Sequence, residues 1–452
     1  MNDAVRVPVA LPPHITLVTP VWGAEYIRLF CDVVCRSLLA PDNLPAISQR
    51  FCCTYHIYTD DEANSHFHSS SFNRLRDLVD LRFHDLGSLT ADNKYSTMGA
   101  AYNDAVNRAS ERQSGIIFLN ADMIYSNGSF AHLSRLIDLG RRCIEIEGFR
   151  ADKQAIENIL TDRYEDLFTI SSAPLVRLAL KHIHPISACH LWEKGGGFMP
   201  FHTYWTVRTG LLARASHIYP LYLWPRSWNG LIAEKSIDWD LVDRAGLAEI
   251  EKYIVQDSQE IFSVELSDVN YWIPPAYPQG ASIGVMRSFV AEHCGPENLQ
   301  RLSRVIRLRT VPDDHLAWKW AEFKSWLWYK AVAENSDTCA LVLNTIALKS
   351  SHVRKAISWA GQSIRAELAS MAVRASAPIK RVAESGREIF RVIAYKYRIG
   401  GIPAVRKGIV NQLTLRVPFV RIVSGKYQRE GTIGVMRGIG RQVRLRVQKR
   451  SN

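Results

Sequence analysis

The stretch GIIFLNADMIYSNGSF, residues 115–130, begins with a short apolar run and turns polar at Asn120-Ala121-Asp122. Apolar runs of this length, rich in β-branched and aromatic residues and ended by polar ones, are typical of buried strands. The segment before it, STMGAAYNDAVNRAS (residues 96–110), offers a serine cap and apolar residues at helical spacing, which predicts a helix. A helix followed by a buried strand places the Asp122 carboxylate at a strand end.

The residues before this stretch continue the alternation of strands and helices. HITLVTPVWG (residues 14–23) and CTYHIYTDDE (residues 53–62) are predicted strands, separated by helical spacing within residues 25–40. LRFHDL (residues 81–86) is a further candidate strand. This alternation predicts an α/β fold with a mostly parallel sheet. Because ligands bind beyond the carboxyl ends of such strands, the polar residues there are expected to converge on one crevice.

Taken as one unit, GAAYNDAVNRASERQSGIIFLNADMIYSNGSF resembles the central segment of GT-A glycosyltransferases, above all those of family 2. In that family a glycine-containing helix with an Ala-x-Asn core leads into a strand that ends on an acidic DXD-type motif. Gly99, Ala101 and Asn103 match the helix, and Asn120-Ala121-Asp122 matches the motif. TPVWG and YTDDE fit the nucleotide loop after the first strand and the acidic end of the second. The resemblance covers residues 14–150, and the order and spacing of the motifs carry it.

The resemblance implies a Rossmann-like GT-A domain over residues 1–290, with a nucleotide-binding half at 14–150 and an acceptor half at 151–290. It implies a nucleotide-sugar donor, with a UDP-type donor favoured, because Asp60 would accept a hydrogen bond from a uracil-type base edge. By the same resemblance, the donor-binding residues are Thr19, Pro20, Trp22, Asp60, Asn103, Asn120 and Asp122.

The resemblance also implies a divalent cation, Mn²⁺ or Mg²⁺, held by Asp122. Such hard cations take oxygen ligands and would neutralise the diphosphate that leaves. The sequence departs from the family at Asn120, where the first acidic residue of the motif is replaced. The amide brings no charge, which puts the metal affinity in question.

An inverting transfer needs a general base that deprotonates the acceptor hydroxyl. In the family this is an Asp or Glu that follows the acidic motif. Asp238 is preferred, since it follows an apolar-aromatic segment and opens a predicted helix, and Asp240 is the second catalytic candidate. The other candidates are Glu193 and Glu234, with His202 and His217 as alternatives, either as a base or as a metal ligand in a retaining enzyme. The stereochemical outcome stays open.

The net charge of +12 is unevenly distributed along the chain. Residues 351–452 carry 22 Lys and Arg against 4 Asp and Glu, a net charge of +18, whereas residues 1–350 carry −6. A basic amphipathic helix is predicted in this C-terminal region, which favours an anionic membrane surface as partner, with nucleic acid as the competing one. A tryptophan-rich helical segment is predicted at residues 291–350.

Eight cysteines without a CxxC pair or a zinc-type pattern favour a reducing compartment. The first residues lack the pattern of a signal peptide, and no run approaches the length of a membrane span. These features predict a cytoplasmic protein, with peripheral contact to the inner face of the membrane as a further expectation.

Three functions compete at this point. The first is a glycosyltransferase acting on a saccharide or lipid-linked acceptor. The second is a catalytically degenerate transferase-like protein that binds anionic lipid or nucleic acid through its basic tail. The third, a nucleotidyltransferase, requires a glycine-rich loop after the first strand, and TPVWGAEY contains a single glycine.

Overall fold

The computed structural model describes most of the chain up to residue 340. The described residues are 11–89, 93–194, 201–233, 237–270, 282–311, 315–340 and 343. The chain divides into two compact units, residues 1–322 and 323–452. The predicted basic region, 351–452, lies outside the described residues, so its helix and its partners stay predictions, as do the domain boundaries drawn from the sequence. Within the described ranges, no helix combines the length and apolar character needed to cross a bilayer.

The first unit is built on a seven-stranded sheet. In spatial order its strands are β11 (Lys252–Ile254), β6 (Cys143–Ile146), β10 (Tyr219–Leu223), β4 (Gly115–Phe118), β1 (Ile15–Pro20), β2 (Cys53–Thr59) and β3 (Asp80–Asp85). β1 pairs in parallel with β2 on one side and with β4 on the other. β2–β3 and β11–β6 are also parallel, while β10 runs antiparallel to both of its neighbours. The predicted α/β fold with a mostly parallel sheet is therefore confirmed.

The strand order creates a switch point between β1 and β4. The chain runs from β1 outward to β2 and β3, and then returns to place β4 on the opposite side of β1. In open α/β sheets, the crevice for ligands lies outside the carboxyl ends of the strands at such a point. The chain leaves β4 at this edge, and the segment ADMIYSNGSF (residues 121–130) follows Asn120.

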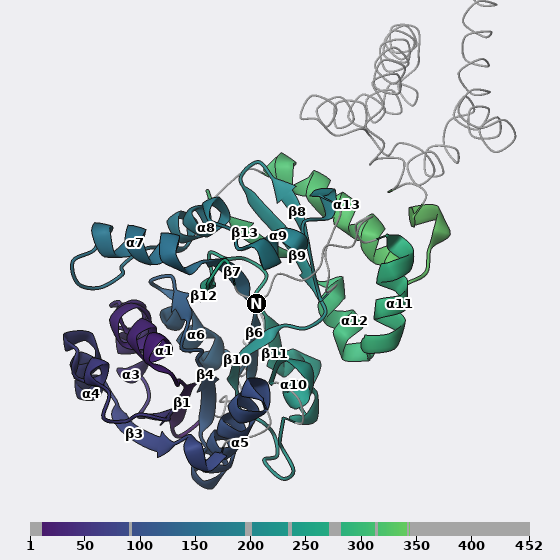
Figure 1. Cartoon of the computed structure of the whole chain (residues 1–452). Helices are drawn as coiled ribbons and strands as arrows, with labels where there is room; N and C mark the ends of the chain where they lie inside the picture. Colours follow the sequence, from purple (N-terminus) through teal and green to yellow (C-terminus); the bar gives the residue numbers. More distant parts are fainter. Residues whose placement is uncertain are drawn as a thin grey trace, which may run out of the picture. The chain divides into compact units, whose positions relative to one another are not determined.

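Both faces of the central strands are buried, which explains their near-continuous apolar sequences. Along β4, Ile117 and Leu119 belong to one apolar cluster, while Ile116 and Phe118 belong to a second cluster on the opposite face. α5 (Lys94–Arg112) packs against β1 and β4 on the second face (Figure 1). The other face is covered by helices from the first part of the chain and by α6. The described α-helices besides α5 are α1 (Ala24–Leu29), α2 (Cys35–Leu38), α3 (Leu44–Ser48), α4 (Ser70–Leu78), α6 (Ser129–Asp138), α7 (Lys153–Arg163), α8 (Ser172–Lys181), α9 (Pro185–Cys189), α10 (Val242–Arg244), α11 (Ile283–His293), α12 (Pro296–Ser303) and α13 (His315–Val332).

The start of α5 differs from the sequence prediction. The helix begins at Lys94, and Asn93 caps it by accepting hydrogen bonds from the backbone N–H groups of Tyr95 and Ser96 at 3.0 and 3.1 Å. The predicted cap, Ser96, lies inside the first turn. Asn is as good an N-cap as Ser, so the helix can start at the earlier residue. The helix is therefore about one turn longer at its N-terminal end than predicted.

Two smaller sheets complete the first unit. β5 (Met123–Tyr125), β12 (Ser263–Ser267) and β7 (Phe149–Asp152) form one, with β12 in the middle. β13 (Ile306–Arg309), β9 (Gly210–Ala215) and β8 (His202–Val207) form the other. The strand β13 falls where a helical segment was predicted. Ile306 and Leu308 are buried while the arginines between and after them are half-buried, which is the period of a strand.

Candidate functional site

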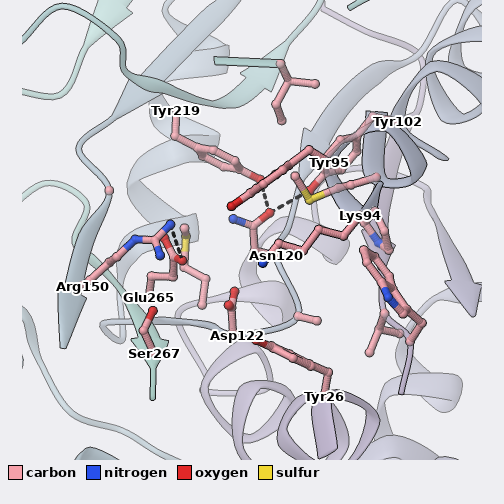
Figure 2. Close-up of a pocket in the computed structure, with 18 of the residues that line it drawn as sticks. Tyr26, Lys94, Tyr95, Tyr102, Asn120, Asp122, Arg150, Tyr219, Glu265 and Ser267 are labelled. Atoms are coloured by element: carbon pink, nitrogen blue, oxygen red, sulfur yellow. Dashed lines mark hydrogen bonds and ion pairs between the residues drawn. The ribbon is translucent and has the colours of Figure 1, made fainter. Parts of the chain in front are cut away.

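A cavity of about 520 Å³ lies at the carboxyl ends of β1 and β4, at the switch point of the sheet. Pro20 and Trp22 line it from the end of β1, and Asn120 and Asp122 from the end of β4. The N-terminal turn of α5 and the small sheet of β5, β12 and β7 provide further walls, and Tyr219 lines the cavity from β10 (Figure 2). The volume is that of a typical small-molecule site.

Four of the predicted donor-binding residues, Pro20, Trp22, Asn120 and Asp122, thus line one cavity. The side chains of the other three lie elsewhere. Thr19 is fully buried and its hydroxyl lies 2.7 Å from the Tyr55 hydroxyl, because β1 alternates and turns this residue into the core. These positions agree with a convergent strand-end site but give Thr19 a packing role.

Asp60 and Asn103 form hydrogen bonds with the backbone of other segments of the chain. Asp60 accepts a hydrogen bond from the backbone N–H of Gly23 at 3.2 Å, so it fixes the loop that carries Trp22. Gly23 has a φ of 77°, a conformation that favours glycine. Asn103 makes a two-way bond with the backbone of Ala233, donating at 3.0 Å and accepting at 2.8 Å. Neither side chain lines the cavity.

Asn120 uses its side-chain oxygen within the protein. Oδ1 accepts hydrogen bonds from the hydroxyls of Tyr102, at 2.7 Å, and Tyr219, at 3.3 Å (Figure 2). With this oxygen occupied by two donors, the group that Asn120 can still offer is the donor pair of Nδ2. A metal ion needs oxygen lone pairs, so the amide fits a ligand oxygen rather than a cation.

Asp122 is half-buried, and its surroundings disfavour its charge. Burial, and after it the nearby Glu265, raise the pKa of the carboxyl to about 7, although Arg150 and Lys94 act in the opposite direction. The backbone oxygen of Asp122 accepts from the N–H of Leu266 at 2.7 Å, which ties the strand end to β12. In the described part of the chain, no side chain donates a hydrogen bond to its carboxylate.

Two cationic side chains flank Asp122. Arg150, on β7, forms an ion pair with Glu265 of β12 at 2.8 Å. Lys94 lies at the start of α5, with its ammonium group 5.0 Å from the centre of the Tyr95 ring. Figure 2 shows both cations around the cavity. A helix start that carries a cation is a favourable place for an anion.

Sequence reasoning did not find Lys94, Tyr102, Arg150, Tyr219 or Glu265 as site residues. One signal was present, because Glu265 interrupts an apolar strand sequence, FSVELS, with a single charge. A lone carboxylate in such a strand indicates a partner or a ligand. The residue opposite, Arg150, comes from a strand far away in sequence, and only the pairing of β7 with β12 brings the two together.

None of the predicted acidic catalytic residues lines the cavity with a described side chain. Asp240 does not line the cavity, and its Oδ2 forms an ion pair with Arg244 at 3.2 Å, one turn along its own helix. The backbone of Asp238 is part of a π-helical turn, Ile237–Leu241, whose first residue lines the cavity, but its side chain lies outside the described residues, as Glu234 does. Glu193 accepts a hydrogen bond from the backbone N–H of Thr206 at 3.3 Å.

The two histidines kept as alternatives, His202 and His217, both line the cavity. Nδ1 of His217 lies 3.0 Å from the hydroxyl of Ser216. Nδ1 of His202 lies 2.9 Å from Oε1 of Glu147, a buried carboxylate at the end of β6. In the part of the chain that the structure describes, no cluster of three or more His, Cys, Asp or Glu has the arrangement of a metal site.

Comparisons with known proteins give partial similarities. No family model matches the chain, and no curated protein matches it. Among solved structures, a fragment of TarS from S. aureus in complex with UDP-GlcNAc is 12% identical over 30% of this chain and 35% of its own, with a TM-score of 0.22. Mouse xyloside xylosyltransferase 1 is 16% identical over 33% of this chain and 57% of its own, also with a TM-score of 0.22. The chain thus spans less than two thirds of either structure, and similarity at this TM-score carries no argument about function.

Proposed function

We propose that the protein is a glycosyltransferase that moves a sugar from a nucleotide-diphosphate sugar to an acceptor hydroxyl. The observation that carries the proposal is the convergence of Asp122 with Lys94 and Arg150 in one cavity at the switch point of the sheet. Nucleotides bind at this place in open α/β sheets. An unpaired carboxylate between two cations suits a ligand that combines phosphate groups with a metal ion.

Asp122 fits a divalent cation, and Asn120 does not. The carboxylate is unpaired within the described residues, and burial and Glu265 penalise its charge, so an arriving cation would relieve both costs. Mg²⁺ in phosphate-binding enzymes is commonly held by one or two carboxylates together with substrate phosphates and water. When bound, the cation would neutralise charge on the diphosphate. Mn²⁺ or Mg²⁺ at Asp122 is therefore part of the proposal.

The remaining lining residues supply binding and orientation. Lys94 and Arg150 would meet phosphate oxygens, and the Nδ2 donors of Asn120 would meet a ligand oxygen. Trp22 and the partly exposed Tyr26 and Tyr95 offer aromatic faces for a base or a sugar ring. The donor sugar, the UDP-type base, the saccharide or lipid-linked acceptor and the role of Asp238 stay predictions from the sequence.

The experiment is calorimetric titration of the full chain with UDP, GDP and CDP, with and without Mn²⁺. We expect one nucleoside diphosphate to bind, Mn²⁺ to tighten the binding, and Asp122→Asn to lose that gain. Asp77→Asn, at an exposed carboxylate on α4, is the matched control and should behave as the wild type. If no nucleotide binds to the folded wild type under any of these conditions, the proposal is wrong.

A further inference from the structure

A buried carboxylate and a cavity-lining histidine form a hydrogen-bonded pair that the proposed function has not used. Oε1 of Glu147 lies 2.9 Å from Nδ1 of His202, and it accepts a second hydrogen bond from the hydroxyl of Tyr204 at 2.7 Å. Glu147 directly follows β6, whereas His202 and Tyr204 lie on β8. His202 lines the same cavity as Asp122. The pair therefore connects the central sheet to the wall of the candidate site.

The burial of Glu147 demands a positive partner. The residue is only 5% exposed, and its second oxygen, Oε2, has no hydrogen-bond donor among the described residues. A buried carboxylate without full pairing costs several kcal/mol unless a nearby group carries positive charge. No arginine or lysine of the described residues forms an ion pair with Glu147, and the basic side chain that the described residues place within hydrogen-bond distance of it is His202. A positive charge on His202 would therefore be stabilised by Glu147.

The hydrogen bond also selects the tautomer of His202. With Nδ1–H donating to Glu147, the lone pair of the neutral ring is on Nε2, the nitrogen suited to accept a proton. The neighbouring His190 does not compete with His202 for the proton. Its ring centre lies 5.5 Å from that of His202, and burial, with His202 and Arg150, lowers the pKa of His190 to about 3, so it stays neutral.

We infer that His202, oriented by Glu147, is the general base that deprotonates the acceptor hydroxyl. The inference rests on the proposed function and assigns its proton transfer. The acceptor O–H proton passes to Nε2 of His202 while the acceptor oxygen bonds to the anomeric carbon. The bond from that carbon to the diphosphate breaks, and its electron pair leaves with the diphosphate. The imidazolium then returns its proton to solvent, and Glu147 is a positioning residue that stabilises the charge.

This assignment differs from the one drawn from the sequence, which preferred Asp238 and then Asp240. Asp240 is paired with Arg244 and lies outside the cavity wall. The charged groups that share the cavity with His202 are Asp122, the Arg150–Glu265 pair, Lys94 and Asp268. These groups are the same in the wild type and in Glu147→Gln. The effect of Glu147 is therefore measured as the difference between the pH profiles of these two proteins.

The test is the rate of nucleotide release from UDP-glucose and UDP-N-acetylglucosamine by the full chain with Mn²⁺, where water or an added sugar is the acceptor. We expect His202→Ala to bind UDP with Mn²⁺ like the wild type but to lose rate by roughly 100- to 10,000-fold. Added imidazole should restore part of the rate. The wild-type rate should rise with pH as His202 loses its proton, and Glu147→Gln should move this rise to lower pH, because a carboxylate raises the pKa of its histidine partner.

Asp77→Asn is the control here as well, since it removes an exposed carboxylate on α4 that does not line the cavity. Its pH profile should stay close to that of the wild type. A ring ¹⁵N spectrum should show the Nδ1–H tautomer of His202, independently of activity. The inference is wrong if UDP binds but His202→Ala keeps the wild-type rate, or if the wild type binds UDP but turns over neither donor. It is also wrong if His202→Ala loses Mn²⁺-dependent UDP binding, because that result indicates a metal ligand. Failure of UDP to bind the wild type overturns the proposed function itself.

Discussion

Replacing Arg301 with methionine should destabilise the first unit severely. Arg301 lies on α12 and is 5% exposed. Its Nε donates to Oε1 of Glu145 on β6 at 2.7 Å, and its Nη2 donates to Oδ1 of Asp243 on α10 at the same distance. Methionine keeps most of the side-chain volume but leaves Glu145, 2% exposed, as a buried charge without a partner. Breaking one side of a buried pair costs about 3–5 kcal/mol, and we expect a loss of this size.

The loss should depend on pH with a definite sign. Burial already raises the pKa of Glu145 above its ordinary value of 4.5, although Arg301 lowers it, and without Arg301 the pKa rises further. The folded variant then retains a proton that the unfolded chain releases, so its stability falls as pH rises between the unfolded and folded pKa values. Urea unfolding should therefore show a larger loss at about pH 8 than at about pH 5.

A second substitution separates the charge from the packing. Because the double variant Glu145→Leu/Arg301→Met buries no unpaired glutamate, it should be clearly more stable than Arg301→Met alone. Arg226→Met is the surface control: this arginine is largely exposed in its ion pair with Glu251, and its loss should stay within about 1 kcal/mol. The reasoning would be refuted if the single and double variants lost the same free energy of unfolding. It would also be refuted if the loss caused by Arg301→Met did not change with pH.

Two further predictions concern the fold. Gly210 has a φ of 151°, and a Cβ there would collide with the backbone oxygen of Leu308, so Gly210→Ala should lower the free energy of unfolding by about 1–3 kcal/mol in thermal or urea melts. A wild-type melting temperature would show that β9 and β13 can separate locally. Burial and the ring of His84 lower the pKa of His56 from 6.5 to about 4, so the unfolded state binds the proton first and stability is lost as pH falls through this window, by up to about 3 kcal/mol. In His56→Gln the urea midpoint should change less with pH over that range. A pH dependence equal to that of the wild type would contradict the assignment.

The strands and helices of residues 14–150 could be predicted from sequence because the information that specifies them is local. The apolar run at Ile116–Leu119 and the polar residues that follow it fix a buried strand and its end, and the structure places Asn120 and Asp122 together in the cavity wall. The same logic fails for Thr19. It stands one residue from the end of β1, and the alternation of the strand turns it into the core while Pro20 and Trp22 reach the cavity.

The opposite wall could not be predicted because its residues meet only through strand pairing. Arg150 and Glu265 face each other since β7 and β12 pair in parallel, and nothing in either segment specifies the other. The Glu147–His202 contact has the same origin, because it joins the end of β6 to the start of β8. Sequence reasoning named His202 as an alternative but had no means of finding its carboxylate.

The balance of charge in the cavity follows from both walls together. The described lining residues include three carboxylates, of Asp122, Glu265 and Asp268, and two cations, Lys94 and Arg150, so one negative charge is in excess when all three carboxylates are ionised and the histidines are neutral. An aspartate at position 120 would add a second negative charge beside the first, at a place where burial and Glu265 already oppose the ionisation of Asp122. The amide at this position instead accepts hydrogen bonds from two tyrosines and adds no charge. The negative charge in the cavity therefore exceeds the charge of the two cations by less than it would with an aspartate. Under the proposed function, a diphosphate bound here would depend on Lys94 and Arg150 as well as on a cation at Asp122. The proposal therefore does not require an acidic residue at position 120.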